Sequence, residues 1–501
     1  MSSYSLLAQD WIRVYDGHGG LNARWIIESY DNGYTMLASA SAYKFTYIMK
    51  TDINGYELWH KYYGDGTYQN IPVNIEQTLD SGYIVAGTMS KYGTDDAFLL
   101  KLNACFEKEW CKVLYTANYY PDYGRRVKPL PDGGYLLLTA YYEGITPGTR
   151  IHLHKFDPNG ELIWQQVYAQ SDSLIFGEEG RDLSILNNNE YLVTGTCFYP
   201  DSGQTGGWIR PFMIKADSMG TCVWEFPWTF GGIFKGKTYK TTVDLAGNSY
   251  SIGFRRGSTG QYPAMIQTSN NGNELFFADL NDTVYFGQGQ TITWTEDSLF
   301  FITAGWTNFD DSRQRVFQIV DLQGNVIRQR DGFLYSNAIV NTVKTFDNKF
   351  ISIAIHYNNN NNWEIHAYKL NYDLEYDTIY TTLFDYDWLC PYGITSDTTD
   401  MDCDILVMVD EQFVPLEEVK LQLFPNPARD RVTIRYPDIT RSGQREIRLV
   451  NSLGVEVKRR PIPKGEEEIQ ADLSGLPPGI YFAILLENGK MIASGKVMVV
   501  R

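Results

Sequence analysis

The sequence predicts an all-β protein in which one sheet-forming unit recurs many times before a smaller β-domain ends the chain. Three observations lead to this class. The 501 residues include 36 Tyr, 25 Phe and 12 Trp, and aromatic side chains favour strands. A turn followed by an aromatic and an apolar run recurs at intervals of 49 to 59 residues. After residue 420 this repeat gives way to a different alternating pattern. A chain of this length also exceeds what one hydrophobic core usually supports.

The repeat has two hairpin signals. The first is a turn before an aromatic and an apolar run, as in Asp80-Ser-Gly-Tyr83-Ile-Val-Ala-Gly. The second follows about 20 residues later as an Asp/Asn-x-x-Gly turn, for example at residues 52–55. Each unit therefore predicts four short antiparallel strands. Seven copies occur, with their marker aromatics at Tyr34, Tyr83, Tyr135, Tyr191, Tyr250, Phe300 and Phe350.

Seven four-stranded units predict a seven-bladed β-propeller over residues 9–385, because radial packing buries both faces of every sheet. An elongated array of stacked sheets is the alternative. Residues 9–19 resemble the fourth strand of a unit but precede the first repeat. We expect this segment to lie in the sheet of residues 336–385, beside or in competition with residues 374–382.

The repeats resemble those of extracellular bacterial and archaeal propellers, whose units read roughly W-x-K-x-Y-G, S-D-G-G-Y-I-V-A-G and L-I-K-L-D-x-x-G. Residues 77–112 are close to this pattern, whereas the sixth unit has Arg328 where Trp59 and Trp164 stand in theirs. The resemblance implies the fold and leaves the function open, because propellers carry many unrelated functions.

Residues 386–420 lose the repeat and predict a linker. From residue 421 a period-two alternation divided by Gly and Pro turns predicts a small β-sandwich over residues 421–501. Its motif residues are Pro425, Asn426, Pro427, Gly479, Tyr481, Gly495 and Lys496.

This C-terminal segment resembles the type IX secretion sorting domain of Bacteroidetes cargo proteins. The resemblance implies recognition by the type IX machinery and a secreted or outer-membrane surface-attached location. An immunoglobulin-like accessory module is the alternative. Residues 1–8 resemble the end of a signal peptide, for which a native polar or disordered N-terminus is the alternative.

The charge distribution bears on the partners. The net charge is −17, and residues 421–501 carry 13 basic against 9 acidic residues, leaving 30 against 51 in the first 420. So acidic a body repels phosphate backbones, which excludes nucleic acid as a favoured partner. The sequence also lacks an apolar run long enough to span a membrane, so we expect a chain that is not membrane-spanning.

The six cysteines fall into sequence-local pairs. In an exported chain this pattern suggests disulfides, and buried free thiols are the alternative. The expected pairs are Cys105–Cys111, Cys197–Cys222 and Cys390–Cys403.

A candidate binding site follows from aligning the repeats. The position ten residues before the marker aromatic starts the innermost strand of each blade, so ring closure would gather its side chains at one mouth of the central channel. Four cations there would bind an anionic ligand, and pairing with carboxylates such as Glu178 or Glu179 is the alternative. The position holds Arg24, Arg125, Arg181 and Lys240, with Val73, Gln290 and Val340 in the other units.

Catalytic and metal-binding motifs are weak. His152 and His154 could share a strand face and bind a metal, but equivalent positions in other repeats are apolar, so we expect packed histidines. The acidic pairs Asp95-Asp96 and Asp310-Asp311 suggest Ca²⁺ but lack a full ligand loop. Exposed aromatics for sugar stacking are expected at Tyr119, Tyr120, Tyr123 and Trp208.

Together these features predict a secreted or surface-displayed binding or adhesion protein with no catalytic residues and no required cofactor. Its ligand would be an anionic glycan or a protein. An extracellular polysaccharide hydrolase or lyase on the same scaffold is the alternative, and a scaffold for other exported proteins is a third.

Overall fold

The computed structural model describes residues 11–500 apart from 92, 117–120, 143–148, 169–175, 188, 201–206, 259, 281–286, 306–315, 332–335, 359–361, 383, 409–420, 436–444, 452–455, 464–465, 467 and 488–489. The predicted N-terminal segment 1–8 lies outside these residues. The chain divides into two compact units, Met1–Val409 and Asp410–Arg501. In the described parts all regular structure is strand, and no helix there is long and apolar enough to cross a bilayer.

In its described residues the first unit forms seven sheets. We number them by their innermost strand. Sheet 1 holds β2 (Leu21–Glu28), β3 (Tyr34–Ala40), β4 (Phe45–Thr51), β5 (Glu57–Tyr63) and β29 (Asp397–Thr399). Sheet 2 holds β6 (Asn70–Gln77), β7 (Tyr83–Met89), β8 (Asp96–Leu102), β9 (Lys108–Thr116) and β30 (Asp404–Met408). Sheet 3 holds β10 (Asp122–Pro129), β11 (Tyr135–Tyr142), β12 (Thr149–Phe156) and β13 (Leu162–Tyr168).

The remaining sheets have four strands each. Sheet 4 holds β14 (Phe176–Ile185), β15 (Tyr191–Pro200), β16 (Gly207–Ala216) and β17 (Cys222–Pro227). Sheet 5 holds β18 (Gly236–Val243), β19 (Ser249–Arg256), β20 (Gln261–Thr268) and β21 (Glu274–Asp279). Sheet 6 holds β22 (Gln288–Trp294), β23 (Phe300–Gly305), β24 (Val316–Val320) and β25 (Val326–Asp331). Sheet 7 holds β26 (Ser336–Lys344), β27 (Phe350–Tyr357), β28 (Trp363–Leu370) and β1 (Ile12–Tyr15).

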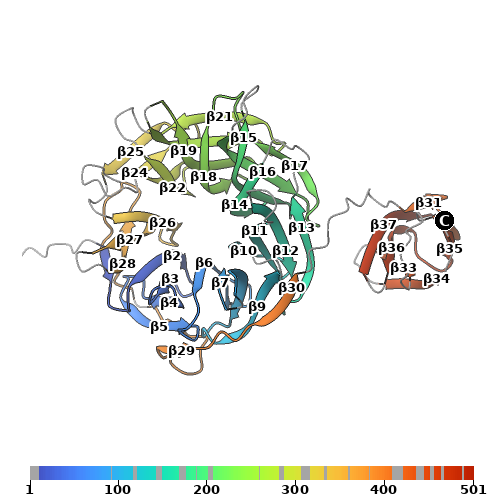
Figure 1. The fold of residues 1–501 in the computed structure, drawn as a ribbon, viewed down its shortest axis with the longest axis horizontal. Coiled ribbons are helices and arrows are strands. Elements are labelled where there is room, and N and C mark those ends of the chain that lie inside the picture. The colour runs from blue at the N-terminus through green and yellow to red at the C-terminus, as the bar shows by residue number, and fades with distance from the viewer. Residues whose placement is uncertain are drawn as a thin grey trace, which may run out of the picture. The chain divides into compact units, whose positions relative to one another are not determined.

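The sheets surround a central axis, as in a propeller (Figure 1). The innermost strands β2, β6, β10, β14, β18, β22 and β26 contact one another in that order, and β26 contacts β2. Strand β1 pairs antiparallel with β28, from Ile12 opposite Tyr368 to Tyr15 opposite Ile365. The prediction that residues near the N-terminus complete the sheet of residues 336–385 is therefore confirmed. Residues 374–382 form no strand there. They contribute an isolated bridge between Leu370 and Tyr376 and a hydrogen bond from the Trp11 amide to the Asp377 carbonyl at 3.2 Å.

In several sheets the aspartate of the recurring turn bonds a lysine on the third strand. In sheet 1, Asp31 Oδ1 accepts a hydrogen bond from the Gly33 amide at 3.0 Å and from Lys50 Nζ at 2.6 Å. Lys50 lies on the third strand, so one carboxylate ties the first hairpin turn to that strand. The same Lys–Asp pair recurs as Lys101–Asp80, Lys155–Asp132 and Lys369–Asp347. The aspartate of the D-x-G-Y motif and the lysine of the L-I-K motif thus form one ion pair.

Residues 386–408 return to the first unit instead of leaving it. Strand β29 adds in parallel to β5, and β30 adds in parallel to β9. Disulfides join Cys105 to Cys390 and Cys111 to Cys403. The predicted linker over 386–420 is therefore wrong for residues 386–408, which we call the strap.

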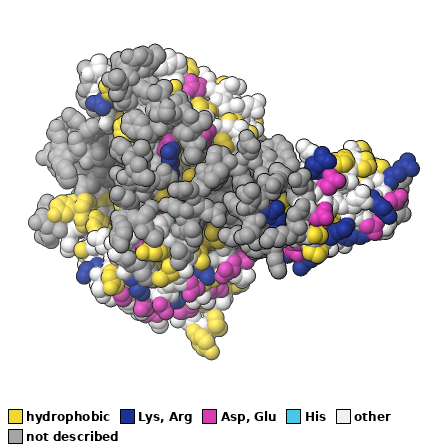
Figure 2. Space-filling model, turned by 45° about the vertical axis from the view of Figure 1, so that its right-hand side comes forward, with side chains coloured by type: hydrophobic (Ala, Val, Ile, Leu, Met, Phe, Trp, Pro, Cys, Tyr) yellow, Lys and Arg dark blue, Asp and Glu magenta, His cyan; other side chains and the backbone are white. Residues whose placement is uncertain are grey.

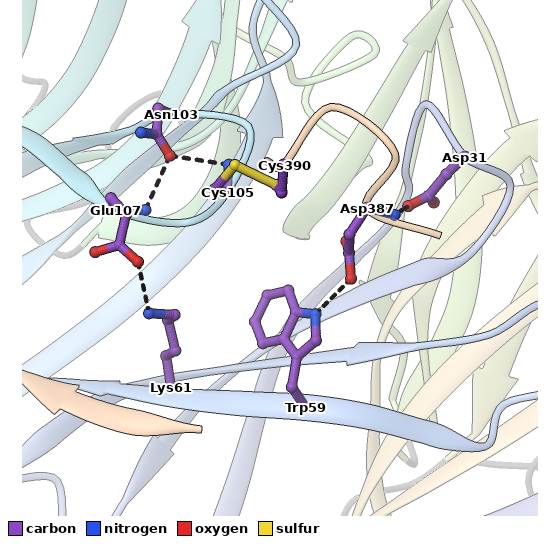
Figure 3. The surroundings of a disulfide bond; sticks show 8 residues. All are labelled: Asp31, Trp59, Lys61, Asn103, Cys105, Glu107, Asp387 and Cys390. Carbon is purple, nitrogen blue, oxygen red and sulfur yellow. Dashed lines mark hydrogen bonds and ion pairs between the residues drawn. A yellow bond between two sulfur atoms is a disulfide. The ribbon is translucent and has the colours of Figure 1, made fainter. Parts of the chain in front are cut away.

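Figure 3 shows how the strap is held near the first disulfide. Trp59 Nε1 donates to Asp387 Oδ2 at 2.8 Å, and the Asp387 amide donates to Asp31 Oδ2 at 3.3 Å. Lys61 Nζ donates to Glu107 Oε1 at 3.1 Å. Lys61 Nζ also donates to Asp397 Oδ1 of the strap at 3.1 Å. Polar contacts thus accompany the covalent link.

The predicted cysteine pairs are wrong. Cys105–Cys111 and Cys390–Cys403 fail because the strap brings each later cysteine against the β8–β9 hairpin. Cys197 and Cys222 are free. They stand opposite Arg210 and Ala216 of β16, and six residues of strand span about 20 Å, too far for a disulfide.

The second unit has two sheets with a shared apolar core. One holds β31 (Gln422–Phe424), β32 (Arg431–Arg435) and β35 (Glu468–Asp472). The other holds β33 (Arg445–Asn451), β34 (Glu456–Ile462), β36 (Gly479–Glu487) and β37 (Lys490–Val499).

We predict that alkylation followed by peptide mapping will reproduce this cysteine pattern. Iodoacetamide should label exposed Cys222 in the native protein and buried Cys197 only after unfolding. The other four cysteines should be labelled only after reduction. Recovery of a crosslinked peptide pair containing Cys105 and Cys111 would contradict the assignment.

We predict unequal effects for two equivalent Lys→Met substitutions. Lys50 and Asp31 are both fully buried, so Lys50→Met strands a buried carboxylate and should lower the free energy of unfolding by about 3–5 kcal/mol. In the pair Lys155–Asp132 the carboxylate is 54% exposed, and Lys155→Met should cost about 0–1 kcal/mol. Denaturant unfolding measures both values, and equal losses would contradict the prediction.

Candidate functional site: the central channel

Every innermost strand contains a β-bulge at an equivalent position of its pairing with the second strand, where the register shifts by one residue and leaves that residue unpaired in the ladder. β14 and β26 each have a second register shift near their starts. Bulges redirect side chains and often occur beside functional sites. Here they place one side chain per sheet at the same level around the axis, which we call the bulge level. These bulge residues are Arg24, Val73, Arg125, Arg181, Tyr239, Gln290 and Val340.

Six bulge residues match the positions aligned from the sequence, and Lys240 does not. In sheet 5, Ser249 pairs where other sheets place the marker aromatic, and Tyr250 lies one residue beyond that position. Tyr239 is therefore the bulge residue, and Lys240 lies one position further along. The repeat spacing points to Lys240 because it is counted from Tyr250, which lies one residue after the marker position.

Arg125 and Arg181 come together at the bulge level. Both form ion pairs with Glu179, from Arg181 at 2.6 Å. The pairing with carboxylates weighed from the sequence thus occurs at two positions, but one carboxylate serves two guanidinium groups. Burial lowers the pKa of Lys237 nearby, as does the charge of Arg181, and Lys237 has no ion pair within the described residues. We call Arg24, Arg125, Glu179, Arg181 and Lys237 the mouth cluster.

Arg24 lies apart from that pair. Its Nε donates to Ser39 Oγ at 3.3 Å, and its guanidinium lies 5.7 Å from the ring centre of Tyr43. Among the described residues no carboxylate pairs with it. Burial lowers the pKa of Arg24.

The bulge level also holds unpaired donors. Arg125 Nε, Arg181 Nε and Gln290 Nε2 are buried and have no hydrogen-bond partner in the described structure. A buried N–H group without an acceptor costs about 1–3 kcal/mol. A ligand oxygen at this level would recover part of that energy.

One position further along, a second group of charges meets across the axis. Lys240 Nζ lies 3.8 Å from the ring centre of Trp25, and Arg126 lies 4.5 Å from the same ring. The three residues come from sheets 5, 1 and 3, so Trp25 reaches the centre of the ring. Asp182 Oδ1 accepts from Arg126 at 3.2 Å. With Lys128, these residues form the channel cluster.

Burial and mutual charge shift the pKa values of residues in the channel cluster. Burial lowers the pKa of Lys240 to about 8 against the opposing charge of Asp182. Burial would raise the pKa of Asp182, but the charges of Lys240, Arg126 and Lys128 together hold it below its usual range. A pocket of about 290 Å³ lies between β14 and β18 and is lined by Lys128, Asp182 and Lys240 among others.

The structure also locates several of the other metal-binding and sugar-stacking candidates from the sequence. His152 and His154 are buried as predicted, and His154 Nε2 bonds Thr139 Oγ1 at 3.0 Å. Trp208 lies against Lys235, 4.1 Å from Nζ to the ring centre, and Tyr123 against Arg125 at 4.8 Å. Tyr119, Tyr120, Asp310 and Asp311 lie outside the described residues. Asp95 and Asp96 belong to neither of the two groups of potential metal ligands in the described chain.

The C-terminal motif residues hold the second unit together. Asn426 Nδ2 donates to the Lys496 carbonyl at 2.7 Å, and Asn426 Oδ1 accepts from the Met498 amide at 2.9 Å. Tyr481 donates its hydroxyl to the Pro477 carbonyl at 2.9 Å. A Cβ on Gly495 would lie 2.8 Å from Leu423 Cδ1, so only glycine fits there without a shift.

Residues 422–500 match the model of the secretion system C-terminal sorting domain family. The protein is therefore a type IX secretion cargo, secreted or attached to the cell surface, with an all-β, propeller-like body. No curated protein sequence matches the chain.

Several solved structures are similar to the chain. A protein of unknown function from Dyadobacter fermentans has 8% identity and a TM-score of 0.44, covering 71% of this chain and 96% of its own. A PL25 ulvan lyase has 10% identity and a TM-score of 0.47, covering 71% and 95%. Drosophila Semaphorin 1a, extracellular domains 1-2, has 9% identity and a TM-score of 0.45, covering 72% and 88%. At these identities the similarity concerns the fold alone.

We predict a pH-dependent contribution of Lys240 to stability. Its pKa is about 8 in the folded protein and near 10.5 when unfolded, so the unfolded state binds more protons between these values and stability rises with pH. Between pH 7 and pH 9 the wild type should gain about 1 kcal/mol that Lys240→Met does not gain. Urea unfolding at both pH values measures this, and parallel changes in the two proteins would contradict it.

Proposed function

We propose that the protein is a secreted or cell-surface binding protein whose body is a seven-bladed β-propeller. The C-terminal β-sandwich serves as the signal recognised by the type IX export machinery. The ligand is an anionic glycan bound at the mouth of the central channel, and an acidic protein segment is the alternative ligand.

The observation that carries this proposal is the donor-rich bulge level. Five of its seven side chains are polar, and three buried N–H groups there lack an acceptor among the described residues. Arg125 and Arg181 share one carboxylate, while in the described part of the chain Arg24 and Lys237 form no ion pair with one. Guanidinium groups suit carboxylate and sulfate oxygens because they present several donors in a planar fork.

Because the first unit is acidic overall, an anionic ligand would bind at the positive channel mouth and not elsewhere on the surface. The first 420 residues carry 51 acidic against 30 basic residues, and acidic side chains are visible along one edge of this unit (Figure 2). An anionic polymer is therefore repelled by much of the surface and attracted at the channel mouth. This contrast favours binding at one place over general adhesion to anions.

We predict that the full chain binds polygalacturonate in preference to neutral dextran. The double variant Arg24→Gln/Lys237→Gln should bind polygalacturonate at least about tenfold more weakly, because it removes the two mouth cations that lack carboxylate partners. The matched variant Lys155→Gln/Arg328→Gln removes the same charge from strands β12 and β25 and should bind like the wild type. Calorimetry at fixed ionic strength measures all three.

Equal affinities of the two variants would contradict a ligand site at the mouth. Release of soluble oligosaccharides during the assay would support the hydrolase or lyase alternative. Absence of polygalacturonate binding by the wild type would favour a protein ligand.

A further inference from the structure

The histidines of this chain are not scattered. The sequence has six, and four of them lie in two His–Glu–His clusters within the described residues. In each cluster one nitrogen from each imidazole and one carboxylate oxygen lie within 4.8 Å of one another. The clusters are His18, Glu57 and His60, and His356, Glu364 and His366.

The first cluster joins two parts of the fold. His18 lies between β1, the outer strand of sheet 7, and β2, the innermost strand of sheet 1, whereas Glu57 and His60 lie on β5. His60 Nδ1 is 2.6 Å from Glu57 Oε1, and His18 Nε2 is 3.9 Å from Glu57 Oε2. The two imidazole centres are 4.4 Å apart. The three side chains are 21–34% exposed, so an ion can enter from solvent.

Neighbouring tyrosines orient both imidazoles. His18 Nδ1 lies 3.2 Å from the Tyr62 hydroxyl. With the proton on Nδ1, that nitrogen donates to Tyr62 and Nε2 directs its lone pair to the side of Glu57. His60 stacks on Tyr47, with ring centres 5.6 Å apart and planes at 27°. Histidines that bind metals commonly bond a second group through the other ring nitrogen, which holds the ring in place.

We propose that His18, Glu57 and His60 bind a Zn²⁺ ion. Two imidazoles and one carboxylate form a donor set typical of zinc, and water completes a tetrahedral shell. Calcium and magnesium prefer shells made only of oxygen. Small side-chain rotations bring the three donor atoms to zinc distances, because they already face one another.

The ion would join the segment that closes the ring to the sheet beside it. Within the described residues β1 pairs with β28 at four positions, and the chain then passes His18 on its way to sheet 1. Zinc bound by His18 and by β5 ties this segment to sheet 1. Because the unfolded chain does not hold these donors together, zinc stabilises the native state. This site is separate from the central channel and does not rest on the proposed function.

The second cluster offers a matched control. Its three residues lie on the adjacent strands β27 and β28 of one sheet, with His356 opposite Glu364. His366 bonds the Tyr368 hydroxyl through Nδ1 at 3.1 Å and Glu364 through Nε2 at 3.3 Å.

The test uses the full chain without a histidine tag, stripped with EDTA and then dialysed against Zn²⁺. Bound zinc is measured by atomic emission, and the midpoint of thermal unfolding with and without Zn²⁺. We expect His18→Gln/His60→Gln to bind one zinc fewer than wild type and to lose the zinc-dependent rise in midpoint. His356→Gln/His366→Gln should keep that zinc and that rise.

Equal zinc content and an equal rise in midpoint for His18→Gln/His60→Gln and wild type would overturn the proposal, as would a wild type that binds no zinc. If the double variant fails to fold, Glu57→Gln replaces it. It keeps the shape of the side chain and should weaken zinc binding at least tenfold. Unchanged affinity in Glu57→Gln would equally overturn the site.

Discussion

The antiparallel pairing of β1 with β28 is the constraint on which the rest of the first unit depends. It places the start of the described chain in the last sheet, so the seven innermost strands follow one another around the axis and return to the first. A closed ring removes the two open sheet faces that an array of stacked sheets would expose. Only a closed ring also allows residues of sheets 1, 3 and 5 to meet at its centre, as Trp25, Arg126 and Lys240 do.

The sequence was most informative about features that recur. Seven marker aromatics and the D-x-G-Y and Lys signals define the sheets, because in four sheets the turn aspartate bonds the lysine of the third strand. Features that occur once were missed. The strap carries no repeat, and its cysteines gave no sign of which hairpin they would meet. Sequence-local pairing therefore failed for Cys105, Cys111, Cys390 and Cys403, whose bonds span 285 and 292 residues.

The candidate site was predicted in outline and corrected in detail. Arg24, Arg125 and Arg181 occupy bulges at one level, which the repeat spacing located. In sheet 5, Ser249 stands at the marker position, so the spacing counted from Tyr250 selected Lys240 in place of Tyr239. The repeat period also does not show which residues of different sheets contact one another across the axis. Trp25 gave no signal as a channel residue, and neither did Arg126, because their contacts join sheets about 100 and 200 residues apart in sequence. The His18–Glu57–His60 cluster was not predicted for a similar reason, since His18 lies in the connection between two sheets and His60 lies on β5.

The two disulfides of the strap have a consequence for the life of the protein outside the cell. Each bond joins the β8–β9 hairpin to residues beyond the last sheet, so sheets 3 to 7 form one covalent loop closed by sulfur. A protease that cuts a single exposed turn in this loop does not release a fragment, because both new ends remain attached through the bonded cysteines. The ring can therefore be nicked and stay whole, with its channel residues still held in register by the uncut sheets around them.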